Sequence, residues 1–472
     1  MKIALIGAGS IVFGTTLLND MLATEALSGA EFALMGPHLP KVQRVENYIR
    51  RIIEGNGLKA SVYATTDRKE ALRGADYVIA MFQIGGMNAF QVDYEIPKKY
   101  GVDVCVGQCV GPGGVFRALR SIPVIVELVK DMEQLCPKAY LLNYVNPMAM
   151  LCMAIGRTSD VRFVGLCHGV QTTLDLISRY VGVKKEQIDF LAAGINHMAW
   201  FLKLEKDGID LYPEFRRNLE KPEYYINEKV RGEVARHFGY FMTESSGHLS
   251  DYLPWFRKNR QALERYCDQP GLGGESGFSY AFGRMMEEKY GRTDFLKYES
   301  GNLEPRSVEY CSYILEALTT GRVFRFNGNV INEGYIANLP QGCCVEVPVY
   351  ADRLGLHPMR VGSLPAPLAA MNLSNIVVQQ LGVEAAISGD PELAVAAIAM
   401  DPLTSAVLTL EEIRDMTIEM FDLEERYLPQ FGKKRPRKIH PVAVPPGTRG
   451  VDVPLDPALA VVHRFGKLVR NE

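Results

Sequence analysis

Short apolar runs alternate with amphipathic stretches along the first third of the chain. Five apolar runs are predicted to be buried strands: Lys2–Ile6, Glu31–Met35, Tyr77–Phe82, Ala139–Tyr144 and Arg162–Leu166. Three stretches between them have helical periodicity: Thr15–Leu22, Lys41–Ile53 and Arg117–Leu135. Strands that alternate with helices indicate a parallel sheet with helical crossovers. The predicted fold class is therefore α/β, with a Rossmann-like doubly wound parallel sheet.

From about residue 200 the pattern becomes mainly helical. Amphipathic stretches occur at Asn227–Tyr240 and Arg306–Leu318, and a strand-like patch follows at Cys343–Tyr350. A chain of 472 residues exceeds one ordinary hydrophobic core. We therefore expect a Rossmann-like domain over residues 1–195 and a second domain over residues 196–472. The second domain is expected to be mainly helical α+β with a small sheet.

Composition and charge narrow the classes of partner. Hydrophobic residues make up 47% of the chain and charged residues 23%, and the net charge of −3 gives no reason to expect nucleic acid or anionic lipid. No apolar run reaches the roughly 18 to 20 residues that span a bilayer. The N-terminus enters a strand directly, and the nine cysteines lack a disulfide-type spacing. We expect a cytoplasmic protein without nucleic-acid or membrane partners.

The chain ends in a proline-rich segment that begins near Gly432 and carries several Lys and Arg residues. Such a segment is more typical of a solvated arm or a subunit contact than of a nucleic-acid site. We expect the protein to form a homodimer or a homotetramer.

The sequence Gly7-Ala8-Gly9-Ser10 follows the first predicted strand and precedes an apolar helix. This is the context of a dinucleotide-binding turn. Gly7 allows the tight turn, and Gly9 lets the backbone approach a pyrophosphate at the helix N-terminus. Gly7, Gly9 and Ser10 are therefore predicted to bind a dinucleotide cofactor.

The end of the second predicted strand departs from the usual pattern. An acidic residue that binds the ribose 2′-hydroxyl is expected there, but this chain has Gly36, followed by His38 and Lys41. This loss indicates either loose cofactor selectivity or tolerance of a 2′-phosphate. We expect NAD, and NADP stays open.

A cysteine and a histidine form the candidate metal site. Cys167 ends a predicted strand at the carboxyl edge of the sheet, where open α/β folds bind ligands, and His197 lies in an otherwise apolar segment. Singly, each is more often an ordinary buried residue. Together with His168 and Asn146 at neighbouring strand ends, they favour a divalent ion such as Mn²⁺, Co²⁺, Ni²⁺ or Fe²⁺. Two protein ligands would leave positions open for substrate oxygens.

A second polar segment runs from Thr243 to His248 and is followed by Asp251-Tyr252-Leu253-Pro254-Trp255. A tyrosine beside a cation can titrate low enough to act as a general base. The alternative is an ordinary helix N-terminus capped by Ser245 or Ser246.

These motifs resemble glycoside hydrolase family 4, the NAD- and metal-dependent glycosidases, and most closely its α-galactosidases. The resemblance covers nearly the whole chain in the expected order. It is carried by the segments Gly7–Ser10, Phe82–Gly86, Gly111–Arg120, Leu142–Met150, Gly165–Val170, Gly194–Met198, Thr243–Phe256, Asn338–Val347 and Val361–Pro365.

The resemblance implies hydrolysis by a redox-elimination route in place of the usual pair of carboxylates. NAD takes a hydride from sugar C3, and the resulting ketone acidifies the C2 proton. A base removes that proton with help from the metal, the aglycone leaves C1, water adds, and NADH returns the hydride. The cofactor is therefore not consumed.

The resemblance also assigns roles to residues. Cys167 and His197 match the metal ligands, His168 stands in the position of the acid, and Tyr252 is the first choice for the C2 base, with Asp251 second.

Three further positions follow from the same resemblance. Asn146 matches a residue that touches substrate oxygens, Gln83 lies in a cofactor-binding segment, and Gln108 replaces an Asp at a position for sugar recognition.

The substrate class follows from the residues after Cys167. Phospho-sugar members carry Asp or Asn there, so His168 favours an unphosphorylated sugar, and α-galactosides are the first choice. Gly169, where α-galactosidases usually have Ser, keeps α-glucuronidase, α-galacturonidase and α-glucosidase open. From other classes, an NAD-dependent dehydrogenase and a non-catalytic nucleotide sensor remain.

Overall fold

The computed structural model describes residues 1–9, 11–291, 296, 299–454 and 456–458. Packing divides the chain into a unit that spans Met1–Arg437 and a second unit that spans Lys438–Glu472. The described residues of the second unit are exposed. Within the first unit one sheet continues past residue 195, and the division of the chain there stays a prediction.

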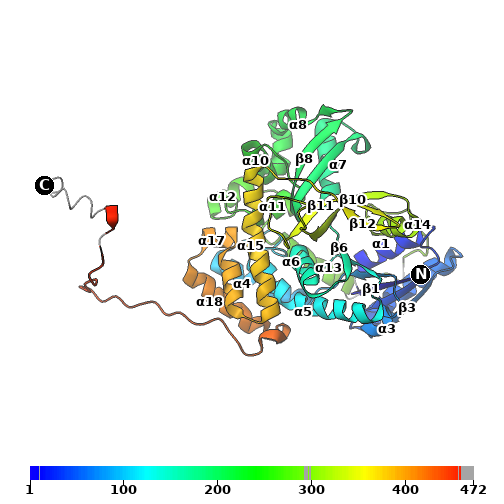
Figure 1. The fold of residues 1–472 in the computed structure, drawn as a ribbon, viewed down its shortest axis with the longest axis horizontal. Coiled ribbons are helices and arrows are strands. Elements are labelled where there is room, and N and C mark those ends of the chain that lie inside the picture. The colour runs from blue at the N-terminus through cyan, green and yellow to red at the C-terminus, as the bar shows by residue number, and fades with distance from the viewer. Residues whose placement is uncertain (10, 292–295, 297–298, 455, 459–472) are drawn as a thin grey trace. The chain divides into compact units, whose positions relative to one another are not determined.

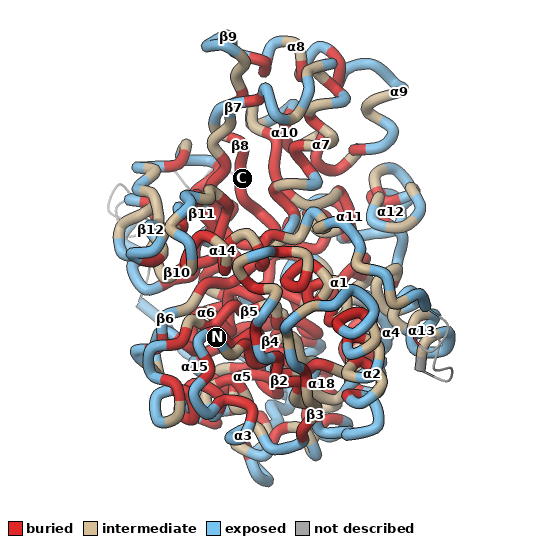
Figure 2. The backbone as a smooth tube through the Cα atoms, turned by 90° about the vertical axis from the view of Figure 1, so that its right-hand side faces the viewer, coloured by how far each residue is buried: buried red, intermediate tan, exposed pale blue. Residues whose placement is uncertain are grey.

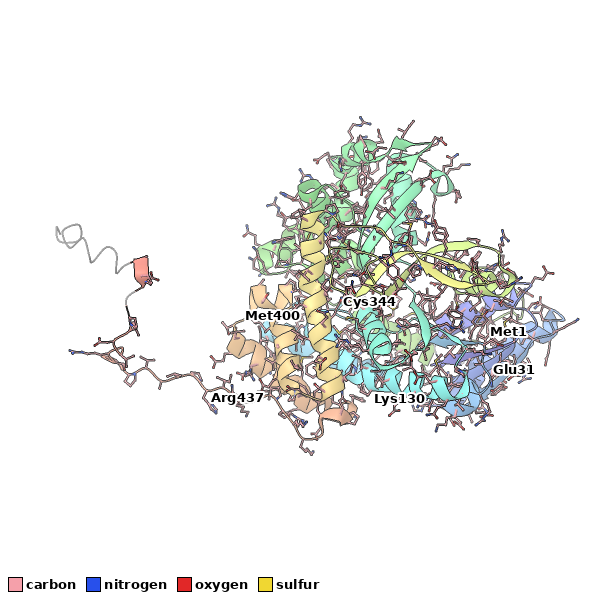
Figure 3. The ribbon with its side chains drawn as sticks, viewed as in Figure 1. Met1, Glu31, Lys130, Cys344, Met400 and Arg437 are labelled. Carbon is pink, nitrogen blue, oxygen red and sulfur yellow. The ribbon has the colours of Figure 1, made fainter. Side chains whose placement is uncertain are left out.

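The first half of this sheet is parallel and follows the strand order of dinucleotide-binding folds. Its strands run in the order β3-β2-β1-β4-β5-β6 (Figure 1). They are β1 (Lys2–Ile6), β2 (Glu31–Met35), β3 (Ser61–Thr65), β4 (Tyr77–Ala80), β5 (Tyr140–Asn143) and β6 (Arg162–Gly165). Lys2 pairs with Glu31 at the start of β1 and β2, and Figure 3 shows Met1 and Glu31 close together at the N-terminal ends of these strands.

The second half is antiparallel and extends the same sheet in the order β10-β11-β7-β8-β9, with β12 beside β11. These strands are β7 (Asp189–Ile195), β8 (Met198–Lys206), β9 (Ile209–Asp210), β10 (Phe324–Ile331), β11 (Cys344–Asp352) and β12 (Gly355–Pro358). Single bridges join β6 to β10 and β11 to β7. The β10–β11 pair therefore connects the end of the parallel half to the β7–β8 hairpin.

The helices of the first half are α1 (Ile11–Leu22), α2 (Leu39–Gly55), α3 (Arg68–Leu72), α4 (Gly86–Tyr100), α5 (Gly111–Leu135), α6 (Met148–Thr158) and α7 (Gly169–Val181). Those of the middle region are α8 (Tyr212–Leu219), α9 (Pro222–Tyr225), α10 (Lys229–Phe238), α11 (Ser246–Tyr252), α12 (Arg260–Tyr266), α13 (Phe278–Gly291) and α14 (Cys311–Thr320). Four more follow: α15 (Ala366–Ser388), α16 (Pro391–Ala399), α17 (Pro402–Val407) and α18 (Leu410–Glu424). Helix α15 packs against α5, α6 and α16.

The structure confirms the predicted fold class, and all five predicted strands form. The patch at Cys343–Tyr350 forms β11, and strands β3, β7, β8, β9, β10 and β12 were not predicted. The apolar positions of β3 are few, because it lies at the sheet edge and is only partly buried. Residues 189–206 form the β7–β8 hairpin, whose centre is buried (Figure 2). Charged side chains at both ends of this segment obscured its strand pattern in the sequence. Among the described residues, no helix is both long and apolar enough to cross a membrane.

A fully buried ion cluster joins helices α4, α5 and α18. The Arg120 guanidinium of α5 donates to Asp93 of α4 and to Glu424 of α18, with Nη1 at 2.8 Å from Asp93 Oδ1 and 3.0 Å from Glu424 Oε2. Its Nε donates to the Ile84 carbonyl at 3.0 Å. The cluster therefore fixes the segment around Gln83 against α5.

Candidate active site

A cleft of about 720 Å³ lies at the carboxyl ends of the parallel strands. Gly7, Gly9, Gln83 and Asn146 all line it, so the structure brings four of the predicted cofactor and substrate residues together. Ser10 lies outside the described residues. Arg117, which was not predicted, also lines the cleft, and its Nε donates to the Asn146 carbonyl at 3.1 Å.

The turn after β1 has the shape that a dinucleotide needs. Gly7 has a φ of +97°, and a Cβ added there would lie 2.8 Å from the Met81 carbonyl carbon. Only glycine therefore fits this turn without strain. Arg117 lines this cleft, and its buried Nη1 atom has no partner among the described residues. An orphaned donor of this kind fits a ligand that brings an acceptor oxygen, as a dinucleotide does.

The end of β2 lacks an acidic side chain, as the sequence indicates. Gly36, His38 and Lys41 line the cleft there. Arg68 lines it too, but its Nη2 atom is paired with Asp131 Oδ2 at 2.6 Å. The described residues at this end are therefore compatible with a ribose hydroxyl and do not repel a 2′-phosphate.

The predicted metal ligands meet where the two halves of the sheet join. Cys167 follows β6, and its carbonyl accepts a hydrogen bond from the Tyr310 hydroxyl. His197 lies in the two-residue turn between β7 and β8, with a φ of +63°. A third residue joins them: ligand atoms of Cys167, His197 and Glu244 all lie within 4.8 Å of one another.

Glu244 precedes helix α11 and has a φ of +72°. Its Oε1 atom accepts a hydrogen bond from the Cys167 thiol at 2.8 Å and lies 3.6 Å from His197 Nε2. The other carboxylate oxygen is 3.9 Å from His248 Nδ1. The segment before Glu244 is held by the Thr243 N–H, which donates to the Ala199 carbonyl of β8. This bond places Glu244 beside the β7–β8 turn.

The charges of this cluster respond to burial and to one another. Burial raises the pKa of the Cys167 thiol well above its usual range, and the Glu244 carboxylate adds to the effect. Burial lowers the pKa of His197. Burial opposes ionisation of Glu244, but the imidazoles of His197 and His248 and the Cys167 donor outweigh it and lower its pKa to about 2. Without metal the cluster therefore holds a thiol, a neutral imidazole and a carboxylate.

The two candidates for the base occupy different environments. Tyr252 ends α11, and its hydroxyl oxygen lies 3.4 Å from His197 Nδ1. Asp251 is buried and accepts hydrogen bonds from the backbone N–H groups of Cys105, Val106 and Gly107 at 2.9, 2.8 and 3.1 Å. Asp251 therefore holds the loop that leads to Gln108, and the geometry favours Tyr252 as the residue nearer to the metal ligands.

The residue predicted as the acid lies at the N-terminus of α7. The His168 side chain is half exposed, and its Nδ1 atom is 3.2 Å from Glu309 Oε1. The hydrogen bond with Glu309 raises the pKa of His168. This contact engages Nδ1 of His168, and its role as the acid stays a prediction.

Sequence reasoning missed Glu244, Glu309 and a buried carboxyl group on β11, Glu346. Glu244 lies inside the polar segment Thr243–His248, which the sequence analysis noted. Nothing in the sequence showed that its carboxylate lies beside Cys167 and His197, so its role was missed. Glu346 is 1% exposed, its Oε1 atom has no partner among the described residues, and burial raises its pKa well above the usual range. Glu346 lies in an apolar strand and no spacing links it to Cys167.

The donor set fits a borderline divalent metal. The ligand atoms of a thiol, an imidazole and a carboxylate lie close together. This combination of donors binds divalent ions such as manganese, iron or zinc. The unpartnered oxygen of Glu346 and the unpartnered Nδ2 atom of Asn196 belong to the same region of the sheet. Buried polar groups without partners are typical of a site that is completed by a ligand.

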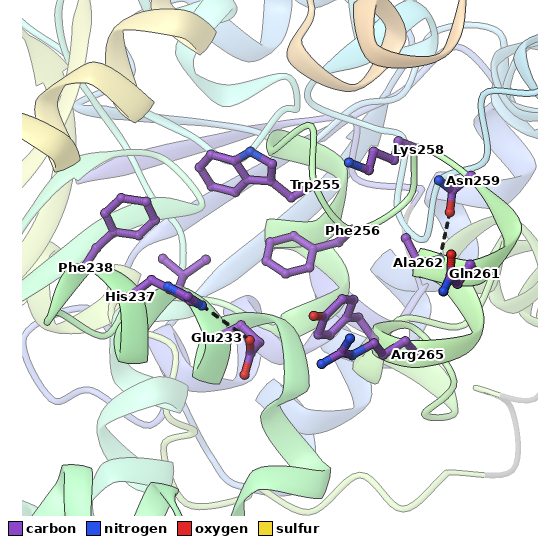
Figure 4. Close-up of a pocket in the computed structure, with 12 residues that line it drawn as sticks. Glu233, His237, Phe238, Trp255, Phe256, Lys258, Asn259, Gln261, Ala262 and Arg265 are labelled. Carbon is purple, nitrogen blue, oxygen red and sulfur yellow. Dashed lines mark hydrogen bonds and ion pairs between the residues drawn. The ribbon is translucent and has the colours of Figure 1, made fainter.

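Another cavity, of about 570 Å³, lies between α10 and α12 (Figure 4). Its lining includes Trp255, Phe238 and Tyr266, and it shares no residue with the predicted site. The Trp255 ring stacks on Phe238 with ring centroids 5.8 Å apart.

The fold and the site define an α/β protein with the strand order and the glycine turn of a dinucleotide-binding fold, and with a candidate metal site at Cys167, His197 and Glu244. The sequence profile described as family 4 glycosyl hydrolase matches residues 2–183, and the profile of the C-terminal domain of the same family matches residues 192–404. The chain belongs to glycosyl hydrolase family 4. The predicted family and enzyme class, a glycosidase, are confirmed.

Individual relatives agree with this assignment. The chain is 40% identical to an alpha-galactosidase of Rhizobium meliloti, over 91% of this chain and 89% of the relative. It is 39% identical to an alpha-galactosidase of Bacillus subtilis, over 91% and 99%. A 6-phospho-beta glucosidase from Thermotoga maritima, solved with manganese, NAD+ and glucose-6-phosphate, has the same fold, with a TM-score of 0.75 and 21% identity over 90% and 99% of the two chains.

Proposed function

We propose that this protein hydrolyses α-galactosides with NAD and a divalent metal, Mn²⁺ as the first choice. The observation that carries the proposal is the convergence of Cys167, His197 and Glu244 beside the dinucleotide cleft. The identity of about 40% to two alpha-galactosidases supports the choice of sugar. NAD is favoured over NADP by the resemblance, and the open end of β2 leaves use of NADP as a second expectation.

The residues have distinct tasks in this proposal. When bound, NAD supplies a hydride acceptor and the metal supplies a Lewis acid. The turn at Gly7 and Gly9 holds the pyrophosphate, while Gln83 and Asn146 border the reacting end. Cys167 and His197 bind the metal, and the Nδ1 atom of His197 near the Tyr252 oxygen leaves Nε2 as the metal-binding atom.

Proton transfers fall to two side chains. Tyr252, ionised to the phenolate by the cation that His197 would hold, takes the C2 proton at its phenol oxygen, which lies 3.4 Å from Nδ1 of His197. His168, held by Glu309, gives a proton to the departing aglycone from Nε2. Gln108, which follows the loop held by Asp251, contacts the sugar in this proposal.

Gly169 does not argue against an α-galactoside. A Cβ at this position would overlap the Glu244 carboxylate. Glycine is therefore explained by local packing, and its presence needs no uronic-acid substrate. An α-galacturonidase or α-glucosidase remains the alternative within the family, because proteins with those names are also relatives, at 28% identity.

The decisive experiment is release of p-nitrophenol from its α-galactoside by reduced, chelator-stripped protein. NAD and Mn²⁺ are added singly and together, and NADH is followed by absorbance. Activity that needs both additions, without net NADH, supports the proposal. Net NADH would indicate a dehydrogenase, and no release would move the assay to the α-glucuronide, α-galacturonide and α-glucoside.

The subunit number is tested separately. We propose a homodimer or a homotetramer, and light scattering after size-exclusion chromatography measures the mass directly against the 52.6 kDa chain. A monomer at assay concentration would contradict the proposal.

A further inference from the structure

Glu244 has a left-handed backbone conformation that a turn alone does not explain. A φ of +72° is costly for any residue with a side chain, and glycine or asparagine would serve such a turn better. Non-glycine residues keep this conformation where their surroundings hold them, and they cluster at functional sites. The side chain of Glu244, not its backbone, is therefore what this position requires.

The carboxylate of Glu244 lies in a space that the neighbouring helix leaves open for it. A Cβ at Gly169, the first residue of α7, would overlap this carboxylate. The carboxylate occupies this position because residue 169 has no side chain. Gly169 and Glu244 form a matched pair although 75 positions separate them.

The partners of this carboxylate do not balance its charge. Among the described residues its contacts are the Cys167 thiol, His197 and His248, and neither Lys nor Arg forms an ion pair with it. The guanidinium of Arg231 reaches only the backbone carbonyl of Glu244, at 2.5 Å. Buried carboxylates are normally paired with a cation or coordinate a metal. A thiolate and a carboxylate together carry two negative charges, which match one divalent ion.

We propose that Glu244 is a third protein ligand of the divalent metal, and that Gly169 is the positioning residue that makes room for it. This inference rests on the proposed metal site at Cys167 and His197. Three protein ligands still leave positions on a six-coordinate ion for two sugar oxygens and a water. The sequence pattern indicated two protein ligands, Cys167 and His197, and no third one.

The test measures Mn²⁺ affinity without turnover, by electron paramagnetic resonance of the free ion, with the full-length protein. Loss of an indirect supporting group typically weakens metal binding 10- to 100-fold, so loss of a direct ligand should raise the Kd by about 100-fold or more. We expect this for Glu244→Gln, which keeps the shape of the side chain, and for Glu244→Ala.

A matched control separates ligation from general electrostatics. Glu309→Gln removes a nearby carboxylate that contacts His168 and no proposed ligand, and its Kd for Mn²⁺ should stay within about threefold of that of the unmodified protein. A change as large as that of Glu244→Gln would overturn the inference. So would a Kd for Glu244→Gln within threefold of that of the unmodified protein.

The pairing with Gly169 gives an independent check. Gly169→Ala should weaken Mn²⁺ binding at least tenfold because it displaces the carboxylate, and it should add nothing further when combined with Glu244→Ala. Additive effects would overturn the role of Gly169. With Co²⁺ in place of Mn²⁺, Glu244→Gln should retain the thiolate charge-transfer band of Cys167 but alter the d–d bands.

Failure of the inference and of the proposed function give different results. If the unmodified protein binds Mn²⁺ and loses it in Cys167→Ser while Glu244→Gln binds normally, only the inference is overturned. If the unmodified protein binds no Mn²⁺, the proposed metal site fails, and the inference that rests on it fails as well.

Discussion

Two clusters of buried charge lie in the same compact unit and differ in how their charge is balanced. In the first, the Arg120 guanidinium contacts the carboxylates of Asp93 and Glu424 directly. In the second, the Glu244 carboxylate contacts the Cys167 thiol and the imidazoles of His197 and His248, and no Lys or Arg among the described residues forms an ion pair with it. The first cluster is complete without a ligand and joins α4, α5 and α18. The second has no Lys or Arg ion-pair partner among the described residues, which supports the proposal that a cation binds there.

The largest expected effect follows from removing a ligand of the second cluster. Cys167→Ser should lower kcat/KM by about 10⁴-fold, or about 5 kcal/mol, because a Lewis acid contributes several kcal/mol to the transition state. The free energy of unfolding of the metal-free protein should change by less than about 1 kcal/mol. Steady-state kinetics and urea unfolding measure the two effects. Cys136→Ser, at a buried cysteine outside the cluster, should keep full activity per folded molecule.

Removal of the cation from the first cluster should have the opposite profile. Arg120→Met leaves two buried carboxyl groups without their cation, which should cost about 3 to 5 kcal/mol of unfolding free energy. The exposed pair Arg260–Glu264 is the control, and Arg260→Met should cost less than about 1 kcal/mol. Equal losses in the two variants, measured by urea unfolding, would contradict the structural role of the Arg120 cluster.

A third test separates the two candidates for the base. Tyr252→Phe should lower kcat by about 10²- to 10⁴-fold, the range for a general base, and leave unfolding nearly unchanged. Asp251→Asn should instead lower the free energy of unfolding by about 1 to 3 kcal/mol, because the carboxylate accepts three backbone hydrogen bonds. A stable Asp251→Asn protein with the kinetic defect expected of Tyr252→Phe would transfer the role of base to Asp251.

The smallest effect is a pH dependence of metal binding. In the metal-free protein burial raises the pKa of Cys167 and lowers that of His197, and the pKa of Glu244 is about 2. At neutral pH only the thiol must therefore lose a proton when the metal binds. Affinity should rise about tenfold per pH unit near neutrality. Calorimetry in buffers with different ionisation enthalpies should report release of about one proton, and release of none would show that Cys167 is already a thiolate.

Much of the nucleotide-binding half is readable from local sequence. The buried strands β1 and β2 and the turn at Gly7 follow from apolar periodicity and from one backbone conformation that only glycine adopts freely. The proximity of Cys167 and His197 could also be predicted, because Cys167 follows a strand and His197 lies in the turn between two strands. These features depend on residues that are close in sequence or on the regular geometry of parallel strands.

Glu244 and Glu346 could not be predicted in the same way. Their meaning depends on distance to Cys167, which is 77 residues from Glu244, and on burial that no local pattern reports. Asp251 illustrates the converse case. Beside Tyr252 in a polar segment it resembles a catalytic group, yet its carboxylate is engaged by backbone N–H groups 144 to 146 residues away.

The sequence by itself determined the α/β fold class, the dinucleotide turn at Gly7 and the family, because apolar periodicity, glycine conformation and short motifs are local properties of the chain. Only the tertiary structure decided which charges are neutralised and which are not. Arg120 meets Asp93 and Glu424, and Glu244 meets Cys167 above Gly169, through packing between distant segments. The balance of buried charge is a property of those contacts, and it distinguishes the structural cluster from the site where chemistry is proposed.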